Sequence, residues 1–200
     1  MPKPSNKNEI IAAGLHVMFR KGYHGAGVRD VVAEAGVPQG SFTNHFRSKE
    51  VFAAEVLDHY FAHTRKLVGD ALNDRSLRPR ERLLRYLDII TKRLANDDYL
   101  RGCLIGDFSI EVSQVSELLR ERLAEIYKEW CKPFEQCVAE GQQAGEISAQ
   151  FSASDLADFL LTSWEGAILR MKVERGPEPL DRFKRIAFAT VFAAERLDRA

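Results

Sequence analysis

GVRDVVAEAGVPQGSFTNHFRSKE, residues 27–50, predicts two short helices separated by a tight turn. In the first half, apolar side chains recur at helical spacing at Val28, Val31, Val32 and Ala35. Gly36 is placed to end that helix, because glycine adopts a left-handed C-terminal conformation at little cost. Pro38 suits the first turn of the next helix, where its missing N–H is not needed. Ser48 is expected to cap a third helix.

The second helix of this stretch predicts a surface that binds DNA. Phe42 and Phe46 lie four residues apart and would pack on one side. Short hydrogen-bonding side chains on the opposite face suit the base edges of the major groove. The residues expected to contact DNA are Arg29, Gln39, Gly40, Ser41, Thr43, Asn44, His45 and Lys49. The alternative is an ordinary pair of surface helices whose polar face is solvated.

Four segments resemble the N-terminal DNA-binding domain of the tetracycline-repressor (TetR) family of bacterial regulators. They are EIIAAGLHVMFRKGY (9–23), VRDVVAEAGV (28–37), GSFTNHFRSKE (40–50) and VFAAEVL (51–57). The resemblance implies an all-α fold of about nine helices and a repressor that binds a palindromic operator in double-stranded DNA. The sequence departs from the family at Gly27, where Ser or Thr is usual, and at Thr43, where Tyr is common.

Composition and charge are those of a globular protein with a slightly basic end. Of 200 residues, 45% are hydrophobic, and no apolar run approaches the ~20 residues of a membrane span. Residues 1–50 hold seven Lys or Arg against four Asp or Glu, and the other 150 hold 22 against 25. Three cysteines, an odd number, argue against a disulfide framework. The N-terminus lacks an apolar signal region, so we expect a cytoplasmic protein with no membrane partner.

The chain shows helical periodicity almost throughout and no alternating strand pattern. We expect a helix-turn-helix DNA-binding domain over residues 1–50 and a helical effector-binding and dimerisation domain over residues 51–200. The first helix is predicted to close at Gly22. The last two helices are predicted over residues 154–173 and 180–197, separated by Gly-Pro-Glu-Pro.

These last two helices are the predicted homodimer interface, because one recognition helix alone selects an operator poorly. Their apolar stripes are Leu156, Phe159, Leu160, Trp164, Ala167 and Met171, then Phe183, Ile186, Ala187, Thr190, Val191 and Ala194. The resemblance implies a four-helix bundle made of this pair from each subunit. The alternative is that both stripes are buried within a single subunit.

The segment RGCLIGDFSIEVSQVSE, residues 101–117, is closest to a TetR subgroup that responds to unsaturated carbonyls, acrylate and related electrophiles. The resemblance implies a small-molecule effector, an electrophile or an unsaturated acid, and a sensing role for Cys103. A small buried packing residue is the other interpretation of Cys103. The expected ligand-binding residues are Phe61, Cys103, Asp107, Tyr127, Trp130, Phe134 and Trp164.

A helical enzyme or metal-binding protein with a coincidental helix-turn-helix pattern is the alternative function. His59 and His63 have the spacing of two metal ligands on one helix face. No further ligand, phosphate-binding loop or nucleophile–base pair is evident. We therefore expect neither an enzyme, nor a cofactor, nor a metal site.

Overall fold

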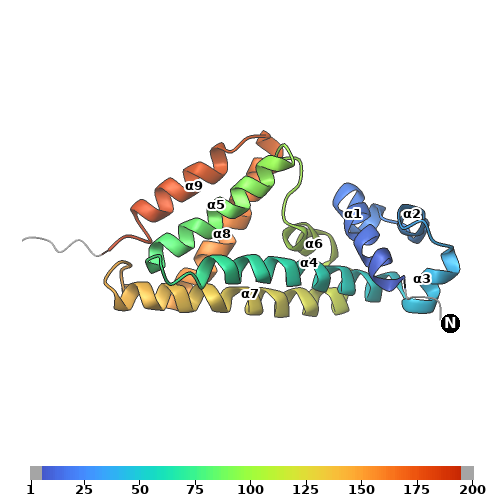
Figure 1. The fold of residues 1–200 in the computed structure, drawn as a ribbon, viewed down its shortest axis with the longest axis horizontal. Helices are drawn as coiled ribbons and strands as arrows, with labels where there is room; N and C mark the ends of the chain where they lie inside the picture. Colours follow the sequence, from blue (N-terminus) through green and yellow to red (C-terminus); the bar gives the residue numbers. More distant parts are fainter. Residues whose placement is uncertain (1–5, 195–200) are drawn as a thin grey trace, which may run out of the picture. The chain divides into compact units, whose positions relative to one another are not determined.

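The computed structural model describes residues 6–194, which form nine α-helices and no strand (Figure 1). The helices are α1 (Lys7–Gly25), α2 (Val28–Glu34), α3 (Gln39–His45), α4 (Lys49–Leu72), α5 (Pro79–Asn96), α6 (Leu104–Val112), α7 (Glu117–Gln143), α8 (Ala153–Glu174) and α9 (Glu178–Ala189). The predicted all-α architecture is confirmed. None of these helices has both the length and the apolar composition that a bilayer span requires.

Contacts divide the chain into two compact units. The head unit contains the chain up to residue 64 together with residues 104–126, and the body unit contains residues 65–103 together with residue 127 onward. The boundary expected after residue 50 was drawn by function and differs from this division by contacts, and it stays a prediction.

An aromatic cluster forms the core of the head unit. The rings of Phe42, Phe46 and Phe52 lie 4.8–5.1 Å apart, and all three side chains are buried. Gly14 of α1 passes directly over this cluster, where a Cβ atom would lie 2.2 Å from the Phe52 ring. This close approach allows α1 to cover the short helices α2 and α3, which could not bury a core alone.

The first helix does not end at Gly22 as predicted. Gly22 breaks the helix with φ 69° and ψ 178°, but a further turn follows as far as Gly25. A positive φ is cheap only for glycine, so the sequence signal was correct for a break and wrong for the end. The Ala26 N–H donates to the Gly22 carbonyl and closes this extra turn.

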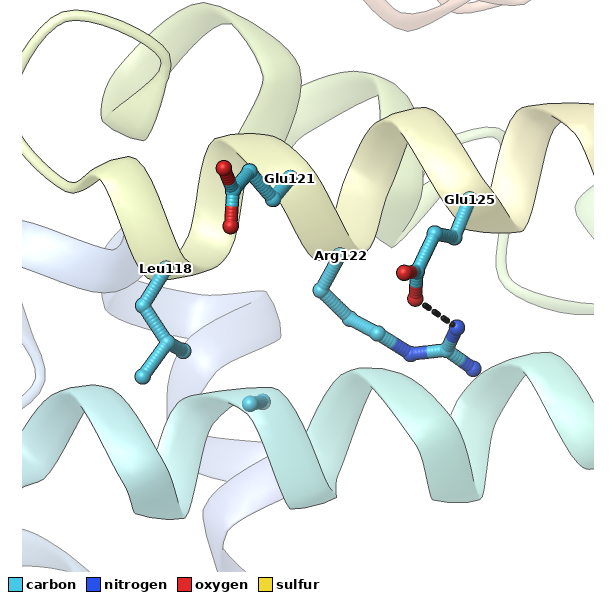
Figure 2. Close-up of a pocket in the computed structure, with 5 residues that line it drawn as sticks. Leu118, Glu121, Arg122 and Glu125 are labelled. Atoms are coloured by element: carbon cyan, nitrogen blue, oxygen red, sulfur yellow. Dashed lines mark hydrogen bonds and ion pairs between the residues drawn. The ribbon is translucent and has the colours of Figure 1, made fainter.

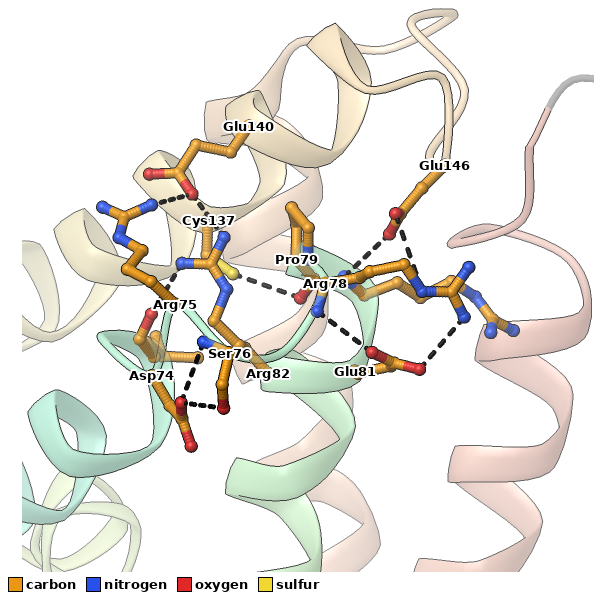
Figure 3. Close-up of polar contacts among 12 residues, drawn as sticks. Asp74, Arg75, Ser76, Arg78, Pro79, Glu81, Arg82, Cys137, Glu140 and Glu146 are labelled. Carbon is orange, nitrogen blue, oxygen red and sulfur yellow. Dashed lines mark hydrogen bonds and ion pairs between the residues drawn. The ribbon is translucent and has the colours of Figure 1, made fainter.

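An ion-pair network in the body unit joins the end of α4, the start of α5 and the end of α7 (Figure 3). Arg82 is buried and donates to the Leu72 carbonyl over 2.8 Å, which satisfies an acceptor at the end of α4. Both Arg82 and Arg75 bind the carboxylate of Glu140, and these bonds lower the pKa of Glu140. The network therefore holds these three helix ends together within the body unit.

The last helix is shorter than predicted. It ends at Ala189 instead of continuing to residue 197, and residues 195–197 lie outside the described part. Arg80 donates to the carbonyls of Phe188 and Phe192 over 2.6 and 2.9 Å, so a side chain replaces the next helical turn as their donor. The backbone N–H of Ser148 donates to the Ala193 carbonyl, which gives a further acceptor of this segment a long-range partner. Such long-range partners are invisible to a helical pattern.

Candidate nucleic-acid interface

A hydrogen bond at its N-terminus and two buried valines stabilise helix α2. Gly27 is the N-cap, and its N–H donates to the Asp30 carboxylate over 3.0 Å, which satisfies one donor before the helix begins. Val31 and Val32 point into the head unit and are buried. Gly36 has φ 65°, so the predicted left-handed turn between the two helices is present.

Helix α3 buries one aromatic face and exposes a polar one. It begins at Gln39, one residue later than predicted, because Pro38 takes the N-cap position. Phe42 is 3% exposed and anchors the helix. On the opposite face Gln39, Gly40, Thr43 and Asn44 are exposed and Ser41 is half-buried.

Two of the predicted DNA contacts, Thr43 and His45, already have hydrogen-bond partners within the head unit. The Thr43 hydroxyl donates to the Gly40 carbonyl over 3.1 Å, and a hydroxyl oxygen keeps its acceptor capacity when it donates. His45 is half-buried, and its Nε2 lies 3.0 Å from the Asn6 Oδ1. His45 is therefore less available for DNA than Asn44, which is exposed on the same helix.

The exposed cations beside the two helices divide into paired and unpaired groups. Lys21 binds Asp30 over 2.8 Å and Arg20 binds Glu34 over 2.7 Å, which joins α1 to α2. Hydrogen bonds from Lys21 and from the Gly27 N–H lower the pKa of Asp30. Arg29 is exposed and takes part in no ion pair among the described residues.

Arg47 and Lys49 follow the recognition helix and differ in their surroundings. Arg47 is exposed two residues after the end of α3 and has no ion pair within the described chain. Arg47 was not among the predicted DNA contacts, although an exposed cation so soon after the polar helix is a usable signal. Lys49 is half-buried, and its Nζ donates to the His24 carbonyl over 3.3 Å. Burial lowers the pKa of Lys49.

A groove of about 450 Å³ lies in the head unit between α4 and α7 (Figure 2). Ala54, Leu118, Glu121, Arg122 and Glu125 line it. Arg122 spans the groove, since it binds Asp58 of α4 over 2.6 Å and Glu125 of α7 over 2.9 Å. None of the residues predicted to bind an effector lines this groove.

The predicted effector residues are divided between the two units. Phe61 and Asp107 belong to the head unit, and the body unit holds Cys103, Tyr127, Trp130, Phe134 and Trp164. In the body unit, Phe134 and Trp164 are fully buried, Trp130 is nearly so, and Tyr127 stacks on Trp130 with ring centroids 6.3 Å apart. No Asp, Glu, His and Cys cluster of three or more that could bind a metal occurs among the described residues.

Tyr86 is a buried polar residue of the body unit that the sequence analysis missed. Its ring packs edge-on against Phe134 with centroids 4.8 Å apart. Burial raises the pKa of Tyr86 well above its ordinary value, and the negative charge of Glu165 adds to this shift. Tyr86 follows Leu83 in an apolar stripe, so its type and spacing suggested core rather than function.

Two of the three cysteines are chemically protected thiols. Burial and the Asp158 carboxylate, which accepts the Cys131 S–H over 3.1 Å, raise the pKa of Cys131 to about 12. Burial also raises the pKa of Cys137 to about 11, and its S–H donates to the Pro79 carbonyl. Because the thiolate is the reactive form, neither is suited to react with electrophiles at neutral pH. Cys103 is buried as well, with the same 8% exposure as Cys131.

Two family models match the chain. The model described as "Bacterial regulatory proteins, tetR family" covers residues 10–56, and "Tetracyclin repressor-like, C-terminal domain" covers residues 79–187. The first match contains α2 and α3, and the second begins at α5 and ends within α9. Together they cover both the helix-turn-helix and the helices that follow it.

Proteins with similar sequences are transcriptional regulators. The chain is 42% identical over 188 residues to the HTH-type transcriptional repressor DhaR of Mycobacterium sp. (strain GP1), with 94% of this chain and 93% of DhaR covered. It is 35% identical to the transcriptional regulator AcuR of Cereibacter sphaeroides, with 88% and 80% covered.

Solved structures agree with these sequence matches. A TetR regulatory protein from Rhodobacter sphaeroides superposes with a TM-score of 0.85 at 34% identity and covers 89% of this chain and 94% of its own. The reduced form of NemR from E. coli gives 0.80 at 27% identity, with 94% and 98% covered. The chain therefore belongs to the TetR family of bacterial regulators.

Proposed function

We propose that this protein is a ligand-responsive transcriptional repressor that binds a palindromic operator as a dimer and is released by a small-molecule effector. The observation that carries the proposal is the exposed polar face of α3, which is held outward by the buried Phe42. A helix anchored in this way can enter the major groove without exposing its core.

Within this proposal, Gln39, Ser41, Thr43 and Asn44 read base edges. Asn44 is the strongest candidate, because an amide presents both a donor and an acceptor and can bind adenine at two points. Arg29 and Arg47 are exposed cations suited to phosphates. A phosphate contact by Lys49 requires its Nζ to rotate away from the His24 carbonyl.

The dimer is proposed through α8 and α9, by a face that keeps Phe159 and Ile186 of the expected stripes but not the other residues expected on α8. Leu156, Leu160, Trp164, Ala167 and Met171 of α8 are buried within one chain. The exposed positions Phe159, Thr162, Gly166, Leu169 and Val173 recur at three- and four-residue steps on another face of α8. An outward apolar stripe of this spacing is typical of a helix that packs on a partner helix.

Gly166 supports this choice of face. A Cβ atom added at Gly166 would meet no atom of residues 6–194 within 4 Å, so its smallness serves no contact in that part of the chain. Ile186 of α9 is 53% exposed and extends the apolar surface. A second copy of the chain is the partner that this surface suits, because two-fold pairing also supplies the second recognition helix.

The effector is proposed to bind in the predicted effector-binding domain, residues 51–200, and to be an electrophile or an unsaturated acid. Cys103 is the candidate sensor, since Cys131 and Cys137 are protected thiols. Reversible binding that leaves Cys103 as a packing residue is the second candidate. A Cys103→Ser variant that still releases DNA fully with an electrophile such as acrolein would favour reversible binding.

The test of the proposed function is a gel shift with the DNA upstream of the gene that encodes this chain. We expect a discrete complex of one dimer per palindrome and dissociation on addition of the effector. Ligand and DNA must oppose each other reciprocally, with a coupling of about 1–3 kcal/mol. Equal affinity for the upstream fragment and for random duplexes would contradict the proposal.

A further inference from the structure

Within the head unit, helix α6 holds the broken end of α1. The N–H of His24, in the extra turn after Gly22, donates to the Glu111 carboxylate over 3.1 Å. The His24 ring returns the contact, because its Nε2 lies 3.2 Å from the Glu111 carbonyl. One residue of α6 thus binds both the backbone and the side chain of one residue of α1.

One aromatic contact and one cation complete this junction. Tyr23 packs edge-on against Phe108 of α6, with ring centroids 5.8 Å apart. The Lys49 Nζ lies 4.6 Å from the centroid of the same Tyr23 ring and donates to the His24 carbonyl. The charge of Glu111 partly offsets the lowering of the Lys49 pKa by burial. The end of α1, the middle of α6 and the start of α4 therefore meet at one place.

Gly22 is fitted to this junction. Its φ of 69° breaks α1, and a Cβ atom there would lie 2.5 Å from the Glu111 Oε1. The carboxylate thus occupies space that only a glycine leaves, and it accepts an N–H that the break removed from the helical pattern.

We propose that Glu111 is a positioning residue for DNA binding, which orients the helix-turn-helix by holding the end of α1 against α6. The proposal rests on the proposed function, since it assumes that α3 reads an operator. Glu111 touches no DNA in this scheme. It acts through α1, which covers α2 and α3 and is ion-paired to α2 by Lys21 and Arg20.

The position of α6 in the chain makes this contact a route for regulation. Helix α6 begins one residue after Cys103, the candidate sensor. A displacement of α6 would pull the Glu111 carboxylate from the His24 N–H and release the end of α1. Operator affinity would then fall although the base-reading residues are unchanged.

The first experiment compares Glu111→Ala, Glu111→Gln and wild type by fluorescence anisotropy on an operator selected from random duplexes with the wild-type protein. We expect Glu111→Ala to weaken operator binding about tenfold, a typical size for coupling between sites. Affinity for a random duplex should change little, because it depends on phosphate contacts. Glu111→Gln should recover part of the loss, since an amide oxygen still accepts the His24 N–H.

Glu117→Ala is the matched control, because Glu117 is an exposed carboxylate in the same unit that binds Arg120 within α7. It should leave operator affinity unchanged. Wild-type operator affinity in Glu111→Ala would overturn the proposal. An equal loss in Glu111→Ala and Glu117→Ala would do the same, because it would reduce the effect to surface charge.

A second experiment uses hydrogen exchange and does not depend on DNA. The amide of His24 should exchange faster in Glu111→Ala than in wild type, while amides of α3 keep their protection. Unchanged exchange at His24 would overturn the proposal that Glu111 holds the end of α1. If the wild-type protein selected no operator, the proposed function would fail, and this exchange measurement would still test the contact between Glu111 and His24.

A double-mutant cycle with Gly22→Ala provides the sharpest test. In wild type the new Cβ meets the carboxylate, whereas in the Glu111→Ala background that conflict is gone. The loss of operator affinity caused by Gly22→Ala should therefore be smaller in the Glu111→Ala background. Strictly additive losses would contradict a shared contact. His24→Ala keeps the backbone N–H bond to Glu111 and removes the ring, with its contacts to the Glu111 carbonyl and to Tyr23, so it should show a smaller loss than Glu111→Ala.

Discussion

Helices α3 and α8 both bury one face and expose another, but their exposed faces differ in chemistry. The outer face of α3 carries amide and hydroxyl groups around Asn44, whereas that of α8 carries Phe159, Leu169 and Val173, which are 43%, 44% and 80% exposed. Polar groups that water already satisfies are suited to exchange water for base edges. Apolar groups gain only from a dry partner surface. The chemistry of the two faces therefore fits the roles proposed for them, a DNA face on α3 and a protein face on α8.

The largest loss of operator affinity is expected when acidic residues replace apolar ones on the exposed face of α8. Leu169→Asp combined with Val173→Asp should convert the dimer into a monomer, since buried charges without partners are costly. Operator affinity should fall at least about 100-fold, because one half-site cannot supply the specificity of two. Analytical ultracentrifugation measures the oligomeric state, and fluorescence anisotropy measures the operator affinity. Lys132→Asp, on the exposed surface of α7, is the control, and a double variant that stayed dimeric would refute this interface.

A smaller and more selective effect is expected at the DNA face. Asn44→Ala should cost about 1–3 kcal/mol of discrimination at one base pair of each half-site. The measurement is a competition between operators that differ at single positions. Uniform weakening across all of them would show that Asn44 does not read bases.

A third change should weaken binding without altering base preference. Arg29→Ala removes an exposed cation from the first helix of the motif, so all duplexes should bind more weakly. The slope of log affinity against log salt should flatten by roughly one unit. Arg47→Ala, measured in parallel, tests whether the arginine two residues after α3 also contacts phosphates. A slope unchanged in both variants would count against phosphate contacts by either arginine.

The smallest effect on DNA binding is expected at the protected thiols. Cys131→Ser and Cys137→Ser should leave operator release by an electrophile unchanged. In wild type at pH 7, N-ethylmaleimide should modify Cys103 before the other two, because raised pKa values leave Cys131 and Cys137 almost entirely as thiols. Mass spectrometry after short exposures gives the order. Modification of Cys131 first would reverse the assignment of the sensor.

Local signals in the sequence predicted the head unit well. Glycine with a positive φ, a proline at a helix start and two aromatics four apart are constraints that neighbouring residues impose, so Gly36, Pro38 and Phe42 were interpreted almost as the structure has them. The Ser48 hydroxyl accepts the Val51 N–H, as a predicted cap should. The errors were the end of α1 and the end of α9, which contacts far along the chain decide.

The candidate sites were predictable only in part. The exposure of Asn44 follows from helical periodicity, whereas the engagement of His45 by Asn6 and of Lys49 by His24 required the folded chain. In the same way, periodicity identified α8 as amphipathic but could not assign its two apolar faces. One of them packs inside the chain, and the other, with Phe159 and Val173, is left outside.

The sequence by itself determined the family, the all-α class and the polar face of the recognition helix, because each depends on residue type at short, regular spacing. Only the tertiary structure decided which cations are paired, which thiols are protected, and how Glu111 of α6 meets His24 of α1. These contacts join residues up to 87 positions apart. Their partners are set by packing between helices, and no local pattern in the chain encodes that packing.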